Sequence, residues 1–332
     1  MNLGFWKKLR KPFFCLAPMA DVTDYPFRQI ITKYGKPDVF WTEFVSADGL
    51  AHPIAKKKLL FNLKFSKNEH PIVAQIFGSN PLNIKKASAL CQKLGFDGVD
   101  INMGCPDRSV EKQNSGAKMI GNFKLVKEII QAAKDGAPKL PISVKTRIGY
   151  NKNEIETWIS FLLEQNISAL TVHLRTRKEM SNVPAHWDLM ERIVQIRNEI
   201  NKDTLIIGNG DVVDLIDVKK KAKVTGCDGV MLGRAIFGNP FLFSKQKCPE
   251  LVEGPSFDVA RDKTIISKLK IMVLHTKLFE KHLGNHKNFA VMKKHFKAYV
   301  NGFDGAKELR VKLMETKNSK EVKKIISNFL TK

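Results

Sequence analysis

Residues 205–234 read LIIGNGDVVDLIDVKKKAKVTGCDGVMLGR, and this stretch decides the fold. Two short apolar runs, Leu205–Gly208 and Gly229–Leu232, flank the segment Val212–Val224, which has helical periodicity. Apolar runs without a polar alternation are typical of parallel strands that helices cover on both faces. The stretch therefore predicts a strand–helix–strand unit of an α/β protein.

Six further apolar runs precede this unit, and helix-like segments lie between them. The predicted strands are Phe13–Pro18, Val39–Phe44, Ile72–Phe77, Gly98–Asn102, Ile142–Thr146 and Ala169–Leu174, and the helix-like segments include Pro81–Leu94, Phe123–Lys134, Glu154–Glu164 and Leu189–Ile200. Eight strand–helix repeats within about 230 residues predict a (β/α)8 TIM barrel. The alternative is a doubly wound sheet, which normally carries phosphate-binding glycines in its first strand–helix turn. Residues 17–24 contain no glycine, so the barrel is favoured.

The chain changes character after Phe243. Residues 244–257 contain Pro249, Gly254 and Pro255, a composition typical of a linker. Helical patterns then follow without a convincing strand, at Asp262–Glu280, Asn288–Tyr299, Ala306–Glu315 and Ser319–Leu330. We therefore predict a barrel over residues 1–243, a linker over 244–257, and a small all-helical domain over 258–332.

The charge balance points to a polyanionic partner. The 332 residues include 56 Lys and Arg against 33 Asp and Glu, a net charge of +23. The last 90 residues hold 20 of these bases and nine of the acids, or +11 of the total. Nucleic acid is the first partner to consider and an anionic membrane surface the second. A composition that simply favours lysine is the third explanation.

The cysteines and the N-terminal residues indicate the compartment. Five cysteines occur without a Cys-x-x-Cys pair, so neither a disulfide scaffold nor a zinc site is expected. The basic start lacks the apolar run of a signal peptide, and no segment approaches the ~20 apolar residues of a membrane span. We expect a cytoplasmic protein without a metal.

Polar residues at the ends of the predicted strands indicate a ligand site at the barrel mouth. Asn209-Gly210-Asp211 and Gly233-Arg234 end the last two strands, where glycines allow backbone N–H groups to approach a phosphate. Lys145 on the fifth strand would point into the same mouth, either toward an anionic ligand or toward a neighbouring carboxylate.

Cys105 lies in a Gly–Cys–Pro turn just after the fourth strand. A free cysteine is usually a small buried apolar residue, but this turn makes exposure at the mouth plausible. The thiol could then act as a nucleophile or as a general acid. Cys15, Cys91, Cys227 and Cys248 fall in strand, helix or linker patterns, and we assign them no chemistry.

Together these segments resemble the tRNA-dihydrouridine synthases. The match runs from about Phe13 to Phe243 and is weaker in the tail. Its segments are Ala17-Pro18-Met19-Ala20 with Thr23-Asp24, Ile101–Pro106 with Lys112 and Gly116-Ala117, Val144–Arg147, His173–Arg177, Asn209–Asp211, Gly233–Ala235, Lys294–Phe296, Tyr299, Gly302 and Arg310. The Asn-x-Gly-Cys-Pro segment is the most specific of them.

The resemblance implies an FMN-containing barrel, a helical tRNA-binding domain and NADPH-driven reduction of a tRNA uridine to 5,6-dihydrouridine. FMN would deliver hydride to C6 of the uracil ring, and Cys105 would protonate C5. The implied cofactor-binding residues are Pro18, Met19, Ala20, Gln75, Lys145, His173, Asn209, Gly210, Asp211, Gly233 and Arg234. The implied substrate-binding residues are Asn102, Arg175, Arg177, Lys294, His295 and Arg310.

The sequence departs from the family pattern at Met180-Ser181 and at Asn114-Ser115, which leaves the loop around Met180 open. Two other functions stay open as well: a small-molecule FMN oxidoreductase on the same barrel, and a tRNA-binding protein without activity. The basic tail and the Gly–Cys–Pro turn argue against the first, and the presence of Cys105 and Lys145 argues against the second. We expect a monomer, because tRNA should cover both the mouth and the tail.

Overall fold

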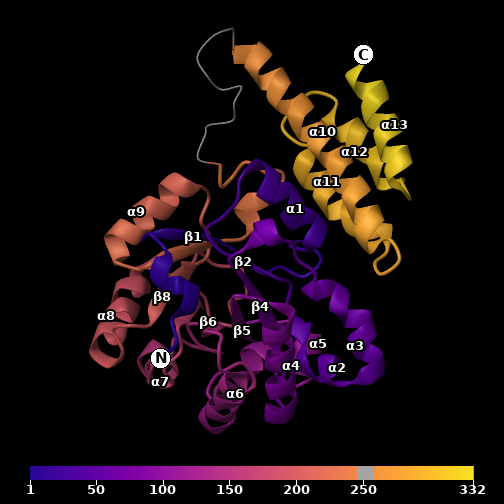
Figure 1. Cartoon of the computed structure of the whole chain (residues 1–332). Helices are drawn as coiled ribbons and strands as arrows, with labels where there is room; N and C mark the ends of the chain where they lie inside the picture. Colours follow the sequence, from indigo (N-terminus) through magenta and orange to yellow (C-terminus); the bar gives the residue numbers. More distant parts are fainter. Residues whose placement is uncertain (245–256, 332) are drawn as a thin grey trace. The chain divides into compact units, whose positions relative to one another are not determined.

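The computed structural model describes residues 1–244 and 257–331, so most of the expected linker and Cys248 lie outside the described residues. The chain divides into two compact units, Met1–Ala20 with Pro37–Gly233, and Asp21–Lys36 with Arg234–Lys332 (Figure 1). The expected barrel over residues 1–243 includes residues 21–36 and 234–243. In the structure they belong with the C-terminal helices, so the compact units differ from the expected division at residue 243.

The first unit is built on parallel strands, and they follow the expected order. They are β1 (Phe13–Leu16), β2 (Phe40–Trp41), β3 (Val45–Ser46), β4 (Ile72–Phe77), β5 (Gly98–Met103), β6 (Ile142–Arg147), β7 (Ala169–His173), β8 (Leu205–Asn209) and β9 (Gly229–Leu232). The predicted second strand is split into β2 and β3, which both pair with β4. Between them the Thr42 hydroxyl accepts the Gln75 N–H at 3.1 Å, where a regular ladder would use a backbone carbonyl.

The strand order β1-β9-β8-β7-β6-β5-β4-β2 describes a nearly closed ring. A parallel bridge between Cys15 and Val39 joins its two ends. With β2 and β3 counted as one position, the ring has eight parallel positions and confirms the predicted TIM barrel. In such a barrel the carboxyl ends of all strands meet at one face, and that face carries the active site.

Helices cover the outside of the ring (Figure 1). They are α2 (Ala47–Ala51), α3 (Pro53–Leu59), α4 (Pro81–Leu94), α5 (Arg108–Glu111), α6 (Phe123–Gly136), α7 (Ser160–Glu164), α8 (Met190–Ile200) and α9 (Leu215–Thr225). Helix α4 has the bounds that the sequence predicts, because Asn80 caps its first N–H groups and Gly95 ends it at φ 86°. Helix α9 begins three residues later than predicted, at the cap formed by Asp214.

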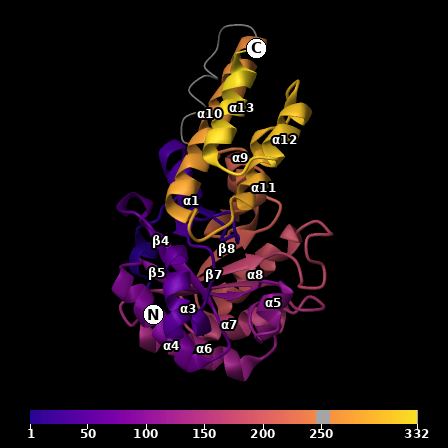
Figure 2. The same ribbon diagram turned by 90° about the vertical axis from the view of Figure 1, so that its right-hand side faces the viewer.

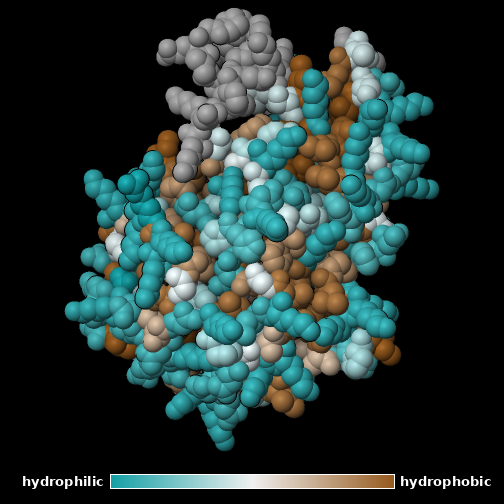
Figure 3. Space-filling view, viewed as in Figure 1, coloured by the Kyte–Doolittle hydropathy of each residue, from teal (hydrophilic) through white to brown (hydrophobic). Residues whose placement is uncertain are grey.

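The barrel interior is filled by side chains. Trp6, from the turn Gly4–Lys8, packs beside Phe13 and Trp41, with ring centroids 5.7 and 6.0 Å apart. All three are buried. Hydrophilic side chains predominate on the face of the molecule in Figure 3, where the strands themselves are hidden. The apolar runs that predicted the strands therefore form the core.

The second unit is all helical, as expected for the C-terminal part of the chain. It contains α1 (Tyr25–Tyr34), α10 (Phe257–Leu283), α11 (Met292–Tyr299), α12 (Ala306–Met314) and α13 (Ser319–Leu330). Helix α10 packs against α1, α11 and α13 (Figure 2). Within the described part of the chain, no helix is long and apolar enough to cross a membrane.

Candidate active site

Five predicted cofactor or substrate residues lie near the carboxyl ends of five neighbouring strands. Gln75 is on β4, Asn102 on β5, Lys145 on β6, His173 on β7 and Asn209 on β8. The register pairs Asn102 with Lys145 and His173 with Asn209. The structure thus brings these side chains to one face of the barrel.

The turn that holds Cys105 is fixed from both sides. Asn102 Oδ1 accepts the backbone N–H groups of Gly104 and Cys105, at 3.1 and 2.9 Å. The Ala117 N–H donates to the Cys105 carbonyl at 2.9 Å. Gly116 is required there, because it has φ +63° and an added Cβ would lie 2.6 Å from that carbonyl. These contacts explain why Asn102 and Gly116-Ala117 accompany the cysteine in the sequence.

The thiol of Cys105 is suited to donate a proton. The residue is half-buried, and burial raises the pKa of its thiol, with the charge of Asp107 adding to the rise. The nearby cations Arg147 and Lys145 oppose this shift without reversing it. The thiol is therefore protonated near neutral pH, which favours a general acid over a thiolate nucleophile. Cys15, Cys91 and Cys227 are buried, as expected for residues without chemistry.

Lys145 presents a half-buried ammonium group at the mouth. Its Nζ donates to Asn209 Oδ1 at 3.1 Å, and the Asn209 amide donates in turn to the Met231 carbonyl at 2.8 Å. Burial lowers the pKa of Lys145 to about 8, with the charge of Arg147 contributing, so the group is still mostly protonated at pH 7. A buried cation hydrogen-bonded to a neutral amide is stabilised by an anionic or strongly accepting ligand. This donor fits the electron-rich ring of a flavin.

Asp211 and the two predicted substrate arginines hold a loop together. Arg175 is 2% exposed, pairs with the Asp211 carboxylate, and donates to the Val183 carbonyl at 2.6 Å. Arg177 forms a two-pronged pair with Glu111 from α5, and its guanidinium lies over the Tyr150 ring. Arg175 thus binds groups of the protein itself, including the Asp211 carboxylate, and its contact with the substrate stays a prediction.

Arg147 connects the Cys105 turn with the loop around Met180. Its Nε donates to the Gly104 carbonyl at 2.8 Å, and its Nη1 donates to the Thr176 and Met180 carbonyls at 3.0 and 3.1 Å. The departure from the family pattern at Met180-Ser181 left this loop open, and in the structure one buried guanidinium ties it to the mouth.

The other predicted cofactor residues are glycines and the end of β1. Gly233 faces Ala17 and Met19, so the ends of β1 and β9 lie together and Pro18–Ala20 follow at the same face. Gly210 has φ +127°, and an added Cβ would lie 2.7 Å from Ala185. Arg234 begins the turn Arg234–Ile236 and belongs to the second unit.

Two of the three predicted RNA-contacting residues of the tail are placed differently from expectation. Lys294 is exposed on α11. His295 is 1% exposed and packs against Phe27 and His275, so its side chain does not lie at the surface where we expected an RNA contact. Its place in the helical pattern next to two lysines gave no sign of burial. Arg310 is half-buried and donates to the Val300 carbonyl at 2.7 Å, just beyond the end of α11.

The buried histidine pair predicts that acid destabilises the helical unit. Both nitrogens of His275 and Nε2 of His295 lack hydrogen-bond partners, and burial lowers both pKa values, that of His295 to about 3. A depressed folded-state pKa means that stability is complete above the unfolded pKa of about 6.5 and is lost as the pH falls toward 3. Helical circular dichroism against pH measures this loss, and His295→Phe should move the midpoint to lower pH by roughly half a unit or more. An unchanged midpoint in His295→Phe would contradict the assignment of the acid sensitivity to the buried histidine pair.

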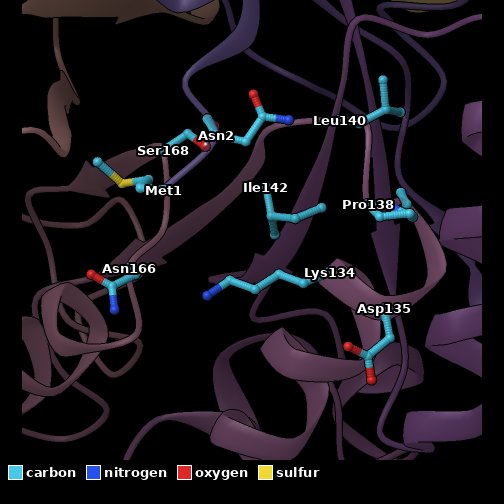
Figure 4. A pocket seen from close by; sticks show the side chains of 10 residues that line it. Met1, Asn2, Lys134, Asp135, Pro138, Leu140, Ile142, Asn166 and Ser168 are labelled. Carbon is cyan, nitrogen blue, oxygen red and sulfur yellow. Dashed lines mark hydrogen bonds between the residues drawn. The ribbon is translucent and has the colours of Figure 1, made fainter.

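A pocket of about 510 Å³ lies at the opposite end of the strands (Figure 4). Ile142 at the start of β6 and Ser168 just before β7 line it, together with Met1, Asn2 and Lys134. The Lys134 ammonium donates to the Gln165 carbonyl at 2.5 Å, and Ser168 donates to the Asn2 carbonyl at 2.6 Å. The Lys134 and Ser168 side chains thus bind the protein's own backbone, and we do not assign the active site to this pocket.

The site lies at the carboxyl face of a parallel α/β barrel and combines a protonated thiol with a half-buried lysine, which is the arrangement of an enzyme. The chain belongs to the dihydrouridine synthase family, whose model matches residues 15–332. It is 42% identical over 331 residues to the "Probable tRNA-dihydrouridine synthase" of Staphylococcus aureus strain Mu50, covering 99% of this chain and 96% of that protein. The "Probable tRNA-dihydrouridine synthase 2" of Bacillus subtilis strain 168 is 41% identical, with 99% and 97% covered.

Solved structures with low sequence identity share the fold. Morphinone reductase in complex with tetrahydroNAD matches with a TM-score of 0.50 and 12% identity, over 78% of this chain and 92% of that one. The 2-naphthoyl-CoA reductase complex with 2-naphthoyl-CoA matches with a TM-score of 0.51 and 10% identity, over 70% and 49%. At such identities the likeness concerns the fold alone.

Proposed function

We propose that the protein is a tRNA-dihydrouridine synthase, which reduces a uridine in tRNA to 5,6-dihydrouridine. The observation that carries the proposal is the fixed, protonated thiol of Cys105 near the half-buried ammonium of Lys145 at the barrel mouth. The family match and the names of the relatives agree with it.

Family membership implies a flavin cofactor, and we propose FMN. When bound, the flavin supplies hydride to C6 of the uracil ring. Lys145 would hold the flavin ring with its ammonium, and Gln75 and His173 would contact it from the neighbouring strands. The ends of β1, β8 and β9, at Pro18–Ala20, Asn209–Asp211 and Gly233-Arg234, would line the rest of the cofactor. At Asp211 the backbone would do so, because its carboxylate holds Arg175.

Cys105 would complete the reaction by protonating C5 of the ring. The proton leaves Sγ, and the resulting thiolate is stabilised by the charges of Arg147 and Lys145, which lower the pKa of this thiol. Asn102 would position the base, and it already fixes the backbone of the cysteine turn. The target base must leave its stack to reach the mouth, which costs a few kcal/mol and less at an unpaired position.

The helical unit would bind the tRNA. Exposed lysines on α11, Lys294 and Lys297, with the half-buried Lys293 beside them, present positive charge for phosphate contacts. Arg177, which is 29% exposed, remains a candidate for contact from the barrel. We further propose that NADPH is the reductant, that the enzyme is a cytoplasmic monomer, and that residues 258–332 are the tRNA-binding part.

We expect the protein to purify yellow and to release FMN on denaturation. A mononucleotide fits a barrel whose last two strands end in glycine turns, and the sequence has no Gly-x-Gly-x-x-Gly turn for a dinucleotide. Chromatography of the denatured supernatant against FMN and FAD standards measures this. Release of FAD would overturn the cofactor assignment.

The proposed function is tested by mapping dihydrouridine in tRNA from a strain that lacks this gene. Loss of the modification at a defined position, restored by the wild-type gene and not by Cys105→Ala, is the expected result. Unchanged dihydrouridine at every position would contradict the proposal and favour a small-molecule oxidoreductase.

A further inference from the structure

A chain of side-chain hydrogen bonds runs beneath the mouth and ends at the Cys105 turn. Gln75 Nε2 donates to Asp100 Oδ2 at 2.7 Å, and Asn102 Nδ2 donates to Gln75 Oε1 at 3.1 Å. Asn102 Oδ1 then accepts the N–H groups of Gly104 and Cys105. The chain thus links a buried residue of β5 with the backbone of the proposed proton donor.

The direction of this chain follows from the chemistry of Asp100. An ionised carboxylate can only accept hydrogen bonds, so Gln75 has to turn its NH₂ toward it. The Gln75 oxygen then faces Asn102, which has to donate its own NH₂ there. This leaves the Asn102 oxygen, and not its NH₂, facing the two backbone N–H groups. Without the carboxylate, neither amide would prefer one orientation over the other, because the oxygen and NH₂ ends of an amide are nearly the same in shape.

We propose that Asp100 is a positioning residue, whose carboxylate sets the orientation of the Gln75 and Asn102 amides and thereby holds Cys105 in its working place. The inference rests on the proposed role of Cys105. Asp100 itself lies within strand β5 and is completely buried, so it acts through its hydrogen-bonded neighbours.

The surroundings of Asp100 keep it an acceptor. Ser143, its register partner on β6, donates to Asp100 Oδ1 at 2.5 Å. Burial raises the pKa of Asp100 to about 6, while Ser143, Gln75, the charge of Lys145 and the Trp41 side chain oppose the rise. The carboxyl is therefore ionised at pH 7 to 8, and Lys145 is the charged group whose field acts on it.

Asp100→Asn keeps the size of the side chain but removes the charge that makes Gln75 turn its NH₂ toward residue 100. Gln75 can then reverse, and a reversed Gln75 offers its NH₂ to the NH₂ of Asn102. If Asn102 reverses in response, its NH₂ meets the N–H groups of Gly104 and Cys105, and these donors lose their acceptor. Leaving such buried donors unpaired should slow proton donation by about 5- to 100-fold.

The experiment measures two quantities on the flavin-loaded protein. One is the single-turnover rate of tRNA reduction by the prereduced enzyme. The other is the rate at which iodoacetamide alkylates each cysteine, read by peptide mass spectrometry. For Asp100→Asn we expect slower turnover together with faster alkylation of Cys105, while the buried Cys15, Cys91 and Cys227 stay protected.

A second substitution should restore the direction in which Asn102 donates its hydrogen bond to residue 75. In the double variant Asp100→Asn with Gln75→Glu, the new amide at position 100 donates to the new carboxylate at position 75, which accepts from Asn102 as the native amide does. Ser143 still finds an acceptor. We expect the alkylation rate of Cys105 to return most of the way to wild type, whatever the altered residue 75 does to flavin affinity. Asp228→Asn, which alters a buried carboxylate paired with Arg197, should leave the Cys105 alkylation rate unchanged.

Wild-type alkylation of Cys105 in Asp100→Asn would overturn the proposal, and so would a double variant no better than the single one. If Asp100→Asn exposes all four of these cysteines by unfolding, neutron diffraction of the unaltered protein decides instead. Deuterium on Gln75 toward Asp100 supports the proposal, and the reverse orientation overturns it. The alkylation result does not depend on turnover, so it separates a failure of this inference from a failure of the proposed function.

Discussion

Replacing Cys105 with alanine is expected to slow tRNA reduction by roughly 100- to 10,000-fold, the usual contribution of a general acid. Flavin content and tRNA affinity should stay close to wild type, because the turn is held by backbone groups of Gly104, Cys105 and Ala117 that alanine retains. Single-turnover kinetics with prereduced enzyme measure the chemical step directly.

Cys91→Ala is the matched control, since Cys91 is a completely buried cysteine of α4. It should change the rate of reduction little. A loss smaller than about tenfold in Cys105→Ala would mean that another group donates the proton.

Changing Lys293, Lys294 and Lys297 together to alanine should weaken tRNA binding by about 10- to 100-fold at moderate salt. Each phosphate contact contributes about 0.9 to the slope of log affinity against log salt on duplex nucleic acid, so the slope should also become shallower by up to about 2.7. A filter-binding salt titration gives both quantities, and flavin content should not change.

The control for this variant removes the same charge from the barrel. Lys85, Lys86 and Lys93 are exposed on α4, and their replacement by alanine should alter the salt slope much less. Equal losses in the two triple variants would show that total charge, and not the α11 surface, governs binding. Truncation after residue 243 is a poorer test, because α1 packs in the helical unit, where Phe27 contacts His275 and His295.

The sequence predicts the barrel well because its strands are short apolar runs, and apolarity is the main sequence feature of a buried parallel strand. Cap chemistry fixes some ends as well: Asn80 and Gly95 bound α4 at the predicted residues. The split of the second strand at Thr42 was not predictable, since it depends on a side chain that bonds Gln75 across the sheet. The grouping of α1 with the C-terminal helices depends on tertiary packing in the same way.

The candidate site was predictable where a motif carries it, and less so where a residue acts through a neighbour. Cys105, Asn102 and Lys145 were identified, and the structure places them at one face. Arg175 looked available for substrate, but its side chain is buried and paired with the Asp211 carboxylate. Asp100 was missed, although a charged residue inside the apolar run of β5 was a visible signal for it.

The most direct test of the proposed reaction is mass spectrometry of unmodified tRNA after incubation with the purified protein, FMN and NADPH. We predict that one uridine gains two hydrogens, that Cys105→Ala makes this gain far slower, and that free uridine is not reduced at a comparable rate. Unchanged tRNA in the presence of a flavin-loaded, reducible protein would contradict it, and rapid reduction of the free pyrimidine would assign the barrel to a small-molecule oxidoreductase.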